Sequence, residues 1–175
     1  TGYTGEDGFE LYLPAGDAPF VWRALEEVGA TPAGLGARDS LRLEMGYALY
    51  GNDIDDETTA LEAGLGWLVK FDAGEFVGSQ ALAAQKAAGV DRRLRAIQLL
   101  GKGFPRPGYD LRWGGEIVGR VRSGTVSPSL GYGIATGYLP SKAGLGDSVE
   151  VVIRDRSIPG RIVRPPFYTE GSLKR

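Results

Sequence analysis

From residue 91 onward the chain consists of short apolar runs separated by turn residues, and this pattern limits the possible folds more than any other feature. Gly114-Gly115 separates two of these runs, and such a pair favours a tight β-hairpin. The runs cover residues 94–100, 109–113, 116–122, 130–138, 148–154 and 160–163. Six short strands with regularly spaced turns predict a small antiparallel barrel or sandwich. The 28 Gly and 10 Pro of the 175 residues fit such a turn-rich fold.

The first 90 residues alternate between loops and short periodic segments. Alternating apolar residues predict half-buried strands at 9–13 and, less regularly, at 66–71. Helical patterns with plausible ends cover residues 17–29, 37–46 and 79–89. We therefore predict an α+β chain of two units: an α+β region over residues 1–90 and a small antiparallel β-barrel domain over residues 91–175.

Charge is divided unevenly between these two units. Residues 1–89 hold 5 Lys and Arg against 15 Asp and Glu, whereas residues 90–175 hold 15 against 7. The simplest interpretation is that the halves attract each other and that docking neutralises both. A nucleic-acid partner is disfavoured, because the Arg residues of the second half are scattered along strands, with no helix to enter a groove.

The chain has neither Cys nor His, which removes several kinds of chemistry. Disulfides, ordinary zinc sites and nucleophiles activated by His are all excluded. The carboxylates of residues 53–57 do not have the spacing of a calcium loop, so we expect a solvated acidic loop and no metal. No apolar run reaches the roughly 18 residues that a membrane span needs, and no secretion signal is visible, so we expect no membrane association and a cytoplasmic location.

The first unit offers three separate candidates for a binding role: the opening segment, Arg38 and Trp67. The opening segment TGYTGEDGFE offers Tyr3 as a flat ring, and Glu6, Asp7 and Glu10 as carboxylates that can accept two adjacent N–H donors of a heterocycle. Arg38 lies near a helix start, where a cation needs a partner, either a structural one or a ligand anion. Trp67 lies among small residues and could wall a flat ligand. Each of these residues also has a structural interpretation: a solvated loop for the opening segment, an ion pair for Arg38 and core packing for Trp67.

Several longer motifs occur in a fixed order and resemble one known family. They are TGYTGEDGFE, PAGLGARDSLRLEMGYALYGNDIDDETTALEAGLGWLVKF, EFVGSQAL, GKGFPRPGY, VGRVRSGTVSPSLGYGIATGYLP and RPPFY. Together they closely resemble the glycine cleavage system T-protein, an aminomethyltransferase, over essentially the whole chain. In that family the GYTGEDG loop lies near the middle of the protein, so this chain resembles the C-terminal half.

The resemblance implies a fold and a reaction. The family forms three domains around a central folate site, and residues 1–90 would be the later part of the folate-binding α+β region. It transfers the methylene of an aminomethyl group, carried on the lipoyl arm of H-protein, to tetrahydrofolate with release of ammonia. By motif, the folate-binding residues of the family fall on Tyr3, Glu10, Arg38 and Trp67, and Tyr168 in PPFY is a fifth candidate.

The catalytic Asp of the family belongs to the N-terminal half, and no Asp of this chain matches its motif. The resemblance therefore assigns no catalytic residue here. We expect the chain alone to have little activity and weak folate affinity, because catalysis in this family is chiefly positioning. Its partners would be lipoylated H-protein and the N-terminal half, and apolar surface left uncovered predicts self-association. In a eukaryote the location would be the mitochondrial matrix.

Three other functions remain open on the sequence. The folate-binding tails of sarcosine and dimethylglycine dehydrogenases share this architecture but follow a flavin domain. A related group that acts in iron–sulfur cluster assembly typically carries a Cys-containing motif, which the absence of Cys disfavours. A non-catalytic, protein-binding barrel has only the basic second half in its favour.

Overall fold

The computed structural model describes residues 2–172, in which three α-helices and six strands are connected by long loops. The α-helices are α1 (Ala18–Glu27), α2 (Leu35–Glu44) and α3 (Ser79–Ala88), and the 3-10 helices are η1 (Ala15–Asp17) and η2 (Gly66–Leu68). The strands are β1 (Arg92–Leu99), β2 (Asp110–Trp113), β3 (Glu116–Val126), β4 (Gly133–Pro140), β5 (Ser148–Ile153) and β6 (Arg156–Val163). The predicted α+β fold class is confirmed.

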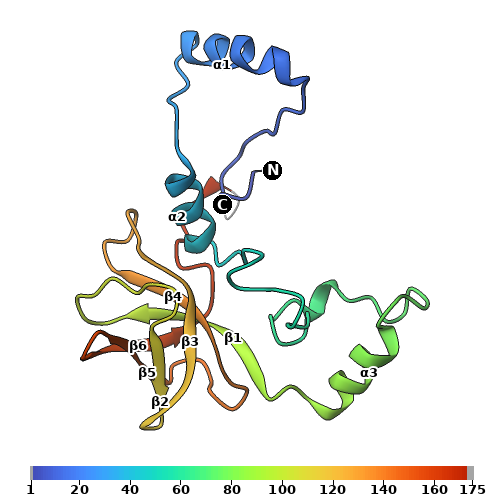
Figure 1. Cartoon of the computed structure of the whole chain (residues 1–175), viewed down its shortest axis with the longest axis vertical. Coiled ribbons are helices and arrows are strands. Elements are labelled where there is room, and N and C mark those ends of the chain that lie inside the picture. The colour runs from blue at the N-terminus through green and yellow to red at the C-terminus, as the bar shows by residue number, and fades with distance from the viewer. Residues whose placement is uncertain (1, 173–175) are drawn as a thin grey trace.

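The six strands close into one antiparallel barrel in the order β1-β4-β3-β2-β5-β6 (Figure 1). Pairing of β1 with both β4 and β6 closes the ring, which leaves the barrel without a free sheet edge. Both residues of the β2–β3 turn, Gly114 and Gly115, have left-handed φ values of 61° and 89°. The Gly-Gly hairpin predicted from the sequence is therefore present.

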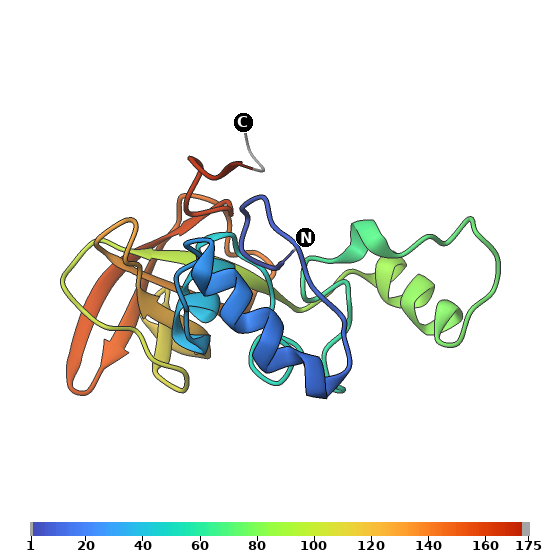
Figure 2. The ribbon, with the colours of Figure 1, turned by 90° about the horizontal axis from the view of Figure 1, so that it is seen from above.

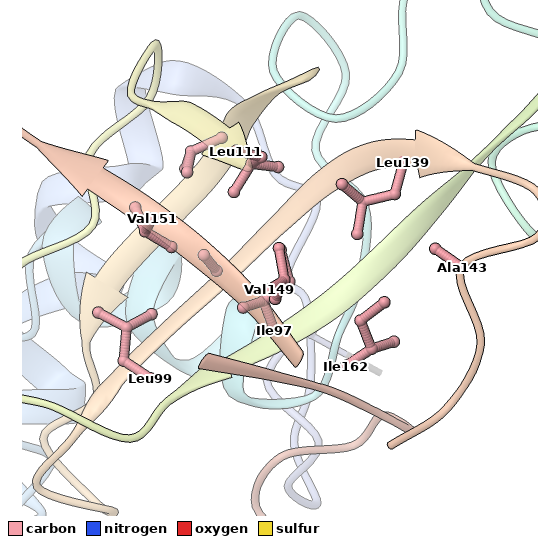
Figure 3. Close-up of a cluster of buried hydrophobic side chains, with 10 residues drawn as sticks. Ile97, Leu99, Leu111, Leu139, Ala143, Val149, Val151 and Ile162 are labelled. Atoms are coloured by element: carbon pink, nitrogen blue, oxygen red, sulfur yellow. The ribbon is translucent and has the colours of Figure 1, made fainter. Parts of the chain in front are cut away.

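The hydrophobic core fills the inside of this barrel. Its side chains come from all six strands and from the loop after β4, and they converge on one another in Figure 3. The fully buried members include Ile97, Leu111, Ala135, Leu139, Val151 and Ile162. The barrel thus supplies most of the burial and is the rigid platform on which the first half is held.

The first half is extended rather than compact. In Figure 1, α1 and α3 project from the rest of the molecule in different directions, and Figure 2 shows α3 at the end opposite the barrel, while α2 lies on the barrel, next to β3 and β4. No residue of α1 or α3 is buried. None of the helices within residues 2–172 is long and apolar enough to cross a membrane.

Two predicted strands are absent. Residues 9–13 form no strand, and Phe9 and Tyr12 are 94% and 91% exposed, because nothing in residues 2–172 pairs with this segment. Residues 66–71 begin with η2 instead of a strand, and Trp67 is 69% exposed. Alternation predicts a strand only where a neighbouring strand can accept its hydrogen bonds.

The two oppositely charged halves meet through ion pairs and through a buried carboxylate. Arg122 pairs with Asp55 at 2.5 Å and Arg92 pairs with Glu62 at 2.8 Å, so basic barrel strands do contact acidic loops. The expectation of a wholly solvated acidic loop is wrong for Asp53, which is 0% exposed. Within residues 2–172, no group of three or more carboxylates is arranged to hold a metal ion.

Candidate functional site

Helix α2 is the element next to which three of the five predicted site residues lie: Tyr3, Arg38 and Tyr168. It follows Gly34, which has an extended backbone, and it begins at Leu35, two residues earlier than the sequence pattern indicates. The helix ends at Glu44, Gly46 follows with a left-handed φ of 72°, and the N–H of Tyr47 donates to the carbonyl of Arg42. This bond satisfies a carbonyl group at the C-terminal end of the helix, and the left-handed Gly46 turns the chain sharply there.

The inward face of α2 is anchored in the barrel by a buried ion pair. Arg42, 1% exposed, donates from Nη1 to Asp53 Oδ2 at 2.7 Å and from Nη2 to Ser123 Oγ at 2.8 Å. The hydroxyls of Ser123 and Thr136, on β3 and β4, donate to the same carboxylate. The charge of Arg42 is compensated by Asp53 in the interior and by the half-exposed Asp39, which lies 2.7 Å from Nη2.

A second buried carboxylate joins α2 to the β3–β4 loop. Glu44 accepts hydrogen bonds from the hydroxyls of Ser127 and Ser129, at 2.5 and 2.9 Å, and from the N–H of Ser129 at 3.2 Å. These serines belong to the Ser-Pro-Ser sequence at residues 127–129. They hold the C-terminal end of α2 against the barrel.

The buried pair also shapes the segment that follows α2. Arg42 Nη1 donates to the carbonyl of Tyr47 at 3.1 Å, and the N–H of Leu49 donates to Asp53 at 2.9 Å. Between them, the carbonyl of Ala48 accepts a hydrogen bond from the hydroxyl of Tyr3. The ion pair therefore fixes the carbonyl that positions Tyr3.

Tyr3 and Arg38, two predicted site residues, lie in contact. The Tyr3 ring stacks on Tyr47 with centroids 5.6 Å apart, and the Arg38 guanidinium lies 5.2 Å from the Tyr3 centroid. Arg38 also donates to the carbonyl of Gly2 at 3.0 Å and is otherwise exposed. The result is a pair of stacked rings with an accessible cation over one of them. Tyr47 was not predicted, although its position just after Met45-Gly46 was a usable signal.

The opening loop that carries Tyr3 is clamped between α2 and the C-terminal segment. At Gly5 a Cβ atom would lie 2.2 Å from the sulfur of Met45, so only glycine lets the loop approach the helix this closely. On the other side, the N–H of Ser172 donates to Glu6 at 2.9 Å. Tyr168 joins the same arrangement through its N–H, which donates to the carbonyl of Glu44 at 3.1 Å.

The remaining predicted residues lie apart from this contact. Glu10 is in the exposed segment before α1 and makes no hydrogen bond or ion pair within residues 2–172. Trp67 lines a separate surface cavity of about 360 Å³ with Gln85, Lys86 and Arg93. The structure thus brings Tyr3, Arg38 and the Tyr168 segment together around α2, and it leaves Glu10 and Trp67 on other exposed surfaces.

Burial affects the proton of Tyr3. The pKa of its hydroxyl is raised, chiefly because the group is partly buried. The positive charge of nearby Arg42 lowers this pKa but does not cancel the effect of burial. The hydroxyl therefore stays protonated throughout the neutral range and can donate to Ala48.

Two family models match the chain over most of its length. The GCVT N-terminal domain matches residues 1–73, and the glycine cleavage T-protein C-terminal barrel domain matches residues 92–169. The chain belongs to the glycine cleavage T-protein family. The resemblance predicted from its motifs is confirmed.

Curated relatives of this T-protein family chain are named aminomethyltransferase. Those of Halothermothrix orenii and Nostoc sp. are 52% and 53% identical to it, over 95% and 96% of this chain and 48% and 45% of their own length. The crystal structure of glycine cleavage system aminomethyltransferase T from Bartonella henselae matches with a TM-score of 0.90 and 35% identity, over 97% of this chain and 49% of that one. The chain spans about half the length of the curated relatives it matches.

Proposed function

We propose that the chain is the C-terminal half of an aminomethyltransferase that transfers a methylene group from the aminomethylated lipoyl arm of H-protein to tetrahydrofolate, with release of ammonia. The observation that carries this proposal is the contact of Tyr3 and Tyr47 with Arg38 of α2, in a chain about 50% identical to aminomethyltransferases. The names of these relatives favour this function over a dehydrogenase tail or a non-catalytic barrel.

The stacked rings of Tyr3 and Tyr47 offer a flat wall for the pterin ring of tetrahydrofolate. Offset stacking and apolar burial would hold that ring. The exposed guanidinium of Arg38 lies over the Tyr3 ring, where it can meet a carboxylate or a carbonyl of the ligand. Because the Tyr3 hydroxyl is engaged with Ala48, we assign Tyr3 a stacking role rather than proton transfer.

Glu10, Trp67 and Tyr168 complete the proposed folate site from other directions. The Glu10 carboxylate is free to accept two N–H donors of the pterin edge, and the exposed Trp67 ring can form an outer wall. Tyr168 lies on the segment that is bonded to the end of α2. We propose that these side chains close around the ligand only when the rest of the protein is present.

The same proposal makes the chain an incomplete enzyme. Residues 1–90 would be the later part of the folate-binding region and residues 91–175 the barrel domain, in the cytoplasm or, in a eukaryote, the mitochondrial matrix. The extended first half exposes the surfaces on which a complete site would depend. Since transfer depends on positioning, half of the walls should give weak folate binding and little or no activity.

A titration of the 175-residue chain with tetrahydrofolate tests the assignment. We expect weak, saturable binding that Arg38→Gln weakens further. The control Arg23→Gln removes the same charge from an exposed position on α1 and should leave the affinity unchanged. Tight one-to-one binding would show that the chain holds a complete site. If the two variants bound tetrahydrofolate with equal affinity, Arg38 would not belong to the folate site.

A further inference from the structure

A cavity of about 600 Å³ opens at the edge of the barrel, between the loop that follows β1 and the β5–β6 hairpin. The loop contributes Lys102 and Arg106, and the hairpin contributes Arg154 and Arg156. In both views, the yellow-green loop and the orange-red hairpin lie at the side of the molecule away from α3 (Figures 1 and 2). The GKGFPRPGY motif, which the proposed folate site does not use, forms this loop.

Within residues 2–172 these four cations form no ion pair, unlike several arginines on the barrel wall. Arg112 pairs with Glu150 and Arg120 pairs with Asp110, each at 3.1 Å. By contrast, within residues 2–172 none of the four cavity cations makes an ion pair or a side-chain hydrogen bond. The lining contains one carboxylate, Asp155. A concave surface with this excess of cations concentrates a positive potential that attracts anions.

The backbone of the hairpin supports a binding role for one of these cations. Ile153 pairs with Arg156, so Arg154 and Asp155 form a two-residue turn, and Arg154 has a φ of 55°. Glycine or asparagine is usual at such a position. Among the described residues, the other non-glycine residue with left-handed φ is Tyr3, in the candidate folate site. A long cationic side chain held in this unfavourable backbone conformation indicates a function for that side chain.

The cavity also has an apolar wall. Phe104, Tyr109 and Ile158 contribute to the lining, and the Arg106 guanidinium lies 5.2 Å from the centre of the Phe104 ring. This contact orients Arg106 without neutralising it. Cations beside an aromatic wall, in a volume typical of small-molecule sites, fit a compact ligand with several negative charges.

We propose that this cavity binds a small molecule that carries two or more phosphate or carboxylate groups. Lys102, Arg106, Arg154 and Arg156 contact the anionic groups, and Phe104 packs against the body of the ligand. The site goes beyond the proposed function, since its residues are not those assigned to tetrahydrofolate. Its occupancy can be measured without any transfer reaction.

Calorimetric titration of the 175-residue chain with inorganic pyrophosphate and, separately, with citrate tests the proposal. We expect saturable one-to-one binding of at least one anion, weakening as salt is raised. Stronger binding of pyrophosphate assigns the site to phosphates, and stronger binding of citrate assigns it to carboxylates. The double variant Arg106→Gln/Arg156→Gln should lose roughly tenfold or more in affinity. The control Arg23→Gln/Arg161→Gln removes equal charge outside the cavity and should bind normally.

Arg154→Gly separates loss of binding from loss of folding. Glycine accepts the left-handed backbone, so the variant should keep or raise the Tm while its anion affinity falls. Absence of saturable binding for both anions would overturn the proposal, as would equal weakening by the two double variants. Binding of a peptide rich in Asp and Glu, but of neither small anion, would also overturn it and would make this surface a protein-docking site.

Discussion

The Asp53 carboxylate is completely buried, yet it is fully provided with hydrogen-bond donors. It accepts from Arg42, the Leu49 N–H, Ser123 and Thr136. Removing one partner of a buried ion pair leaves the other charged and desolvated. At the scale of single residues, this pair joins the barrel to the segment that positions Tyr3.

Asp53→Asn should therefore lower the free energy of unfolding by about 3 kcal/mol, because Arg42 keeps its charge but loses its buried counterion and retains only the half-exposed Asp39. Urea unfolding measures this change. Glu57→Gln is the matched control on the same loop and should change stability little, since Glu57 is exposed. If the two variants were equally stable, the buried pair would not anchor α2.

The Asp55–Arg122 pair gives a pH dependence of known sign. The pKa of Asp55 is lower than its usual value, chiefly because its carboxylate accepts a hydrogen bond from Arg122. Stability from this group is therefore present above the unfolded-state pKa, about 3.9, and is lost as pH falls through the lower folded-state pKa. In urea unfolding, the advantage of the wild type over Asp55→Asn should be full at pH 7 and shrink at lower pH. An advantage that stays constant down to pH 2 would show that the Asp55 charge contributes nothing.

At the scale of elements, the barrel could be predicted from the sequence and the arrangement of the first half could not. Strand residues and turn glycines follow one another closely along the chain, and the Gly114-Gly115 hairpin depends on neighbours alone. The Arg42 network joins residues about 70 to 80 positions apart, so no local pattern reveals that Arg42 is buried. Segment 9–13 has strand alternation, but within residues 2–172 it has no partner strand.

The hairpin between β2 and β3 gives a test at this scale. Gly114→Ala should lower the free energy of unfolding by about 1 kcal/mol, because alanine resists the left-handed φ of 61°. Gly144→Ala is the control, since a Cβ atom there meets open space and its φ is not left-handed. Urea unfolding of both variants compares them. Equal stability of the two would mean that the turn conformation does not limit the residue at position 114.

At the scale of the whole molecule, the first half exposes apolar surface that the barrel does not cover. Phe9, Tyr12 and Leu35 are 84% exposed or more, and α1 has no buried residue. Such surface is rare on stable monomers. The relatives are about twice as long, which supports the proposal that a further half of the protein covers it.

The isolated chain should therefore self-associate. Sedimentation velocity should show an average mass that rises above that of the monomer as the concentration rises. Phe9→Glu/Tyr12→Glu should weaken association, whereas Ile117→Glu, at a half-exposed position on the barrel, should not. A monomer at all concentrations would show that the exposed surface does not promote association.

The most direct test of the central claim is the KM for tetrahydrofolate of a full-length protein in which this chain follows the preceding half of the Halothermothrix orenii relative. The assay measures aminomethyl transfer from lipoylated H-protein. We predict that the joined protein is active, that Arg38→Gln raises the KM roughly tenfold or more, and that Arg23→Gln leaves it unchanged. An active protein in which both variants keep the parental KM would contradict the account.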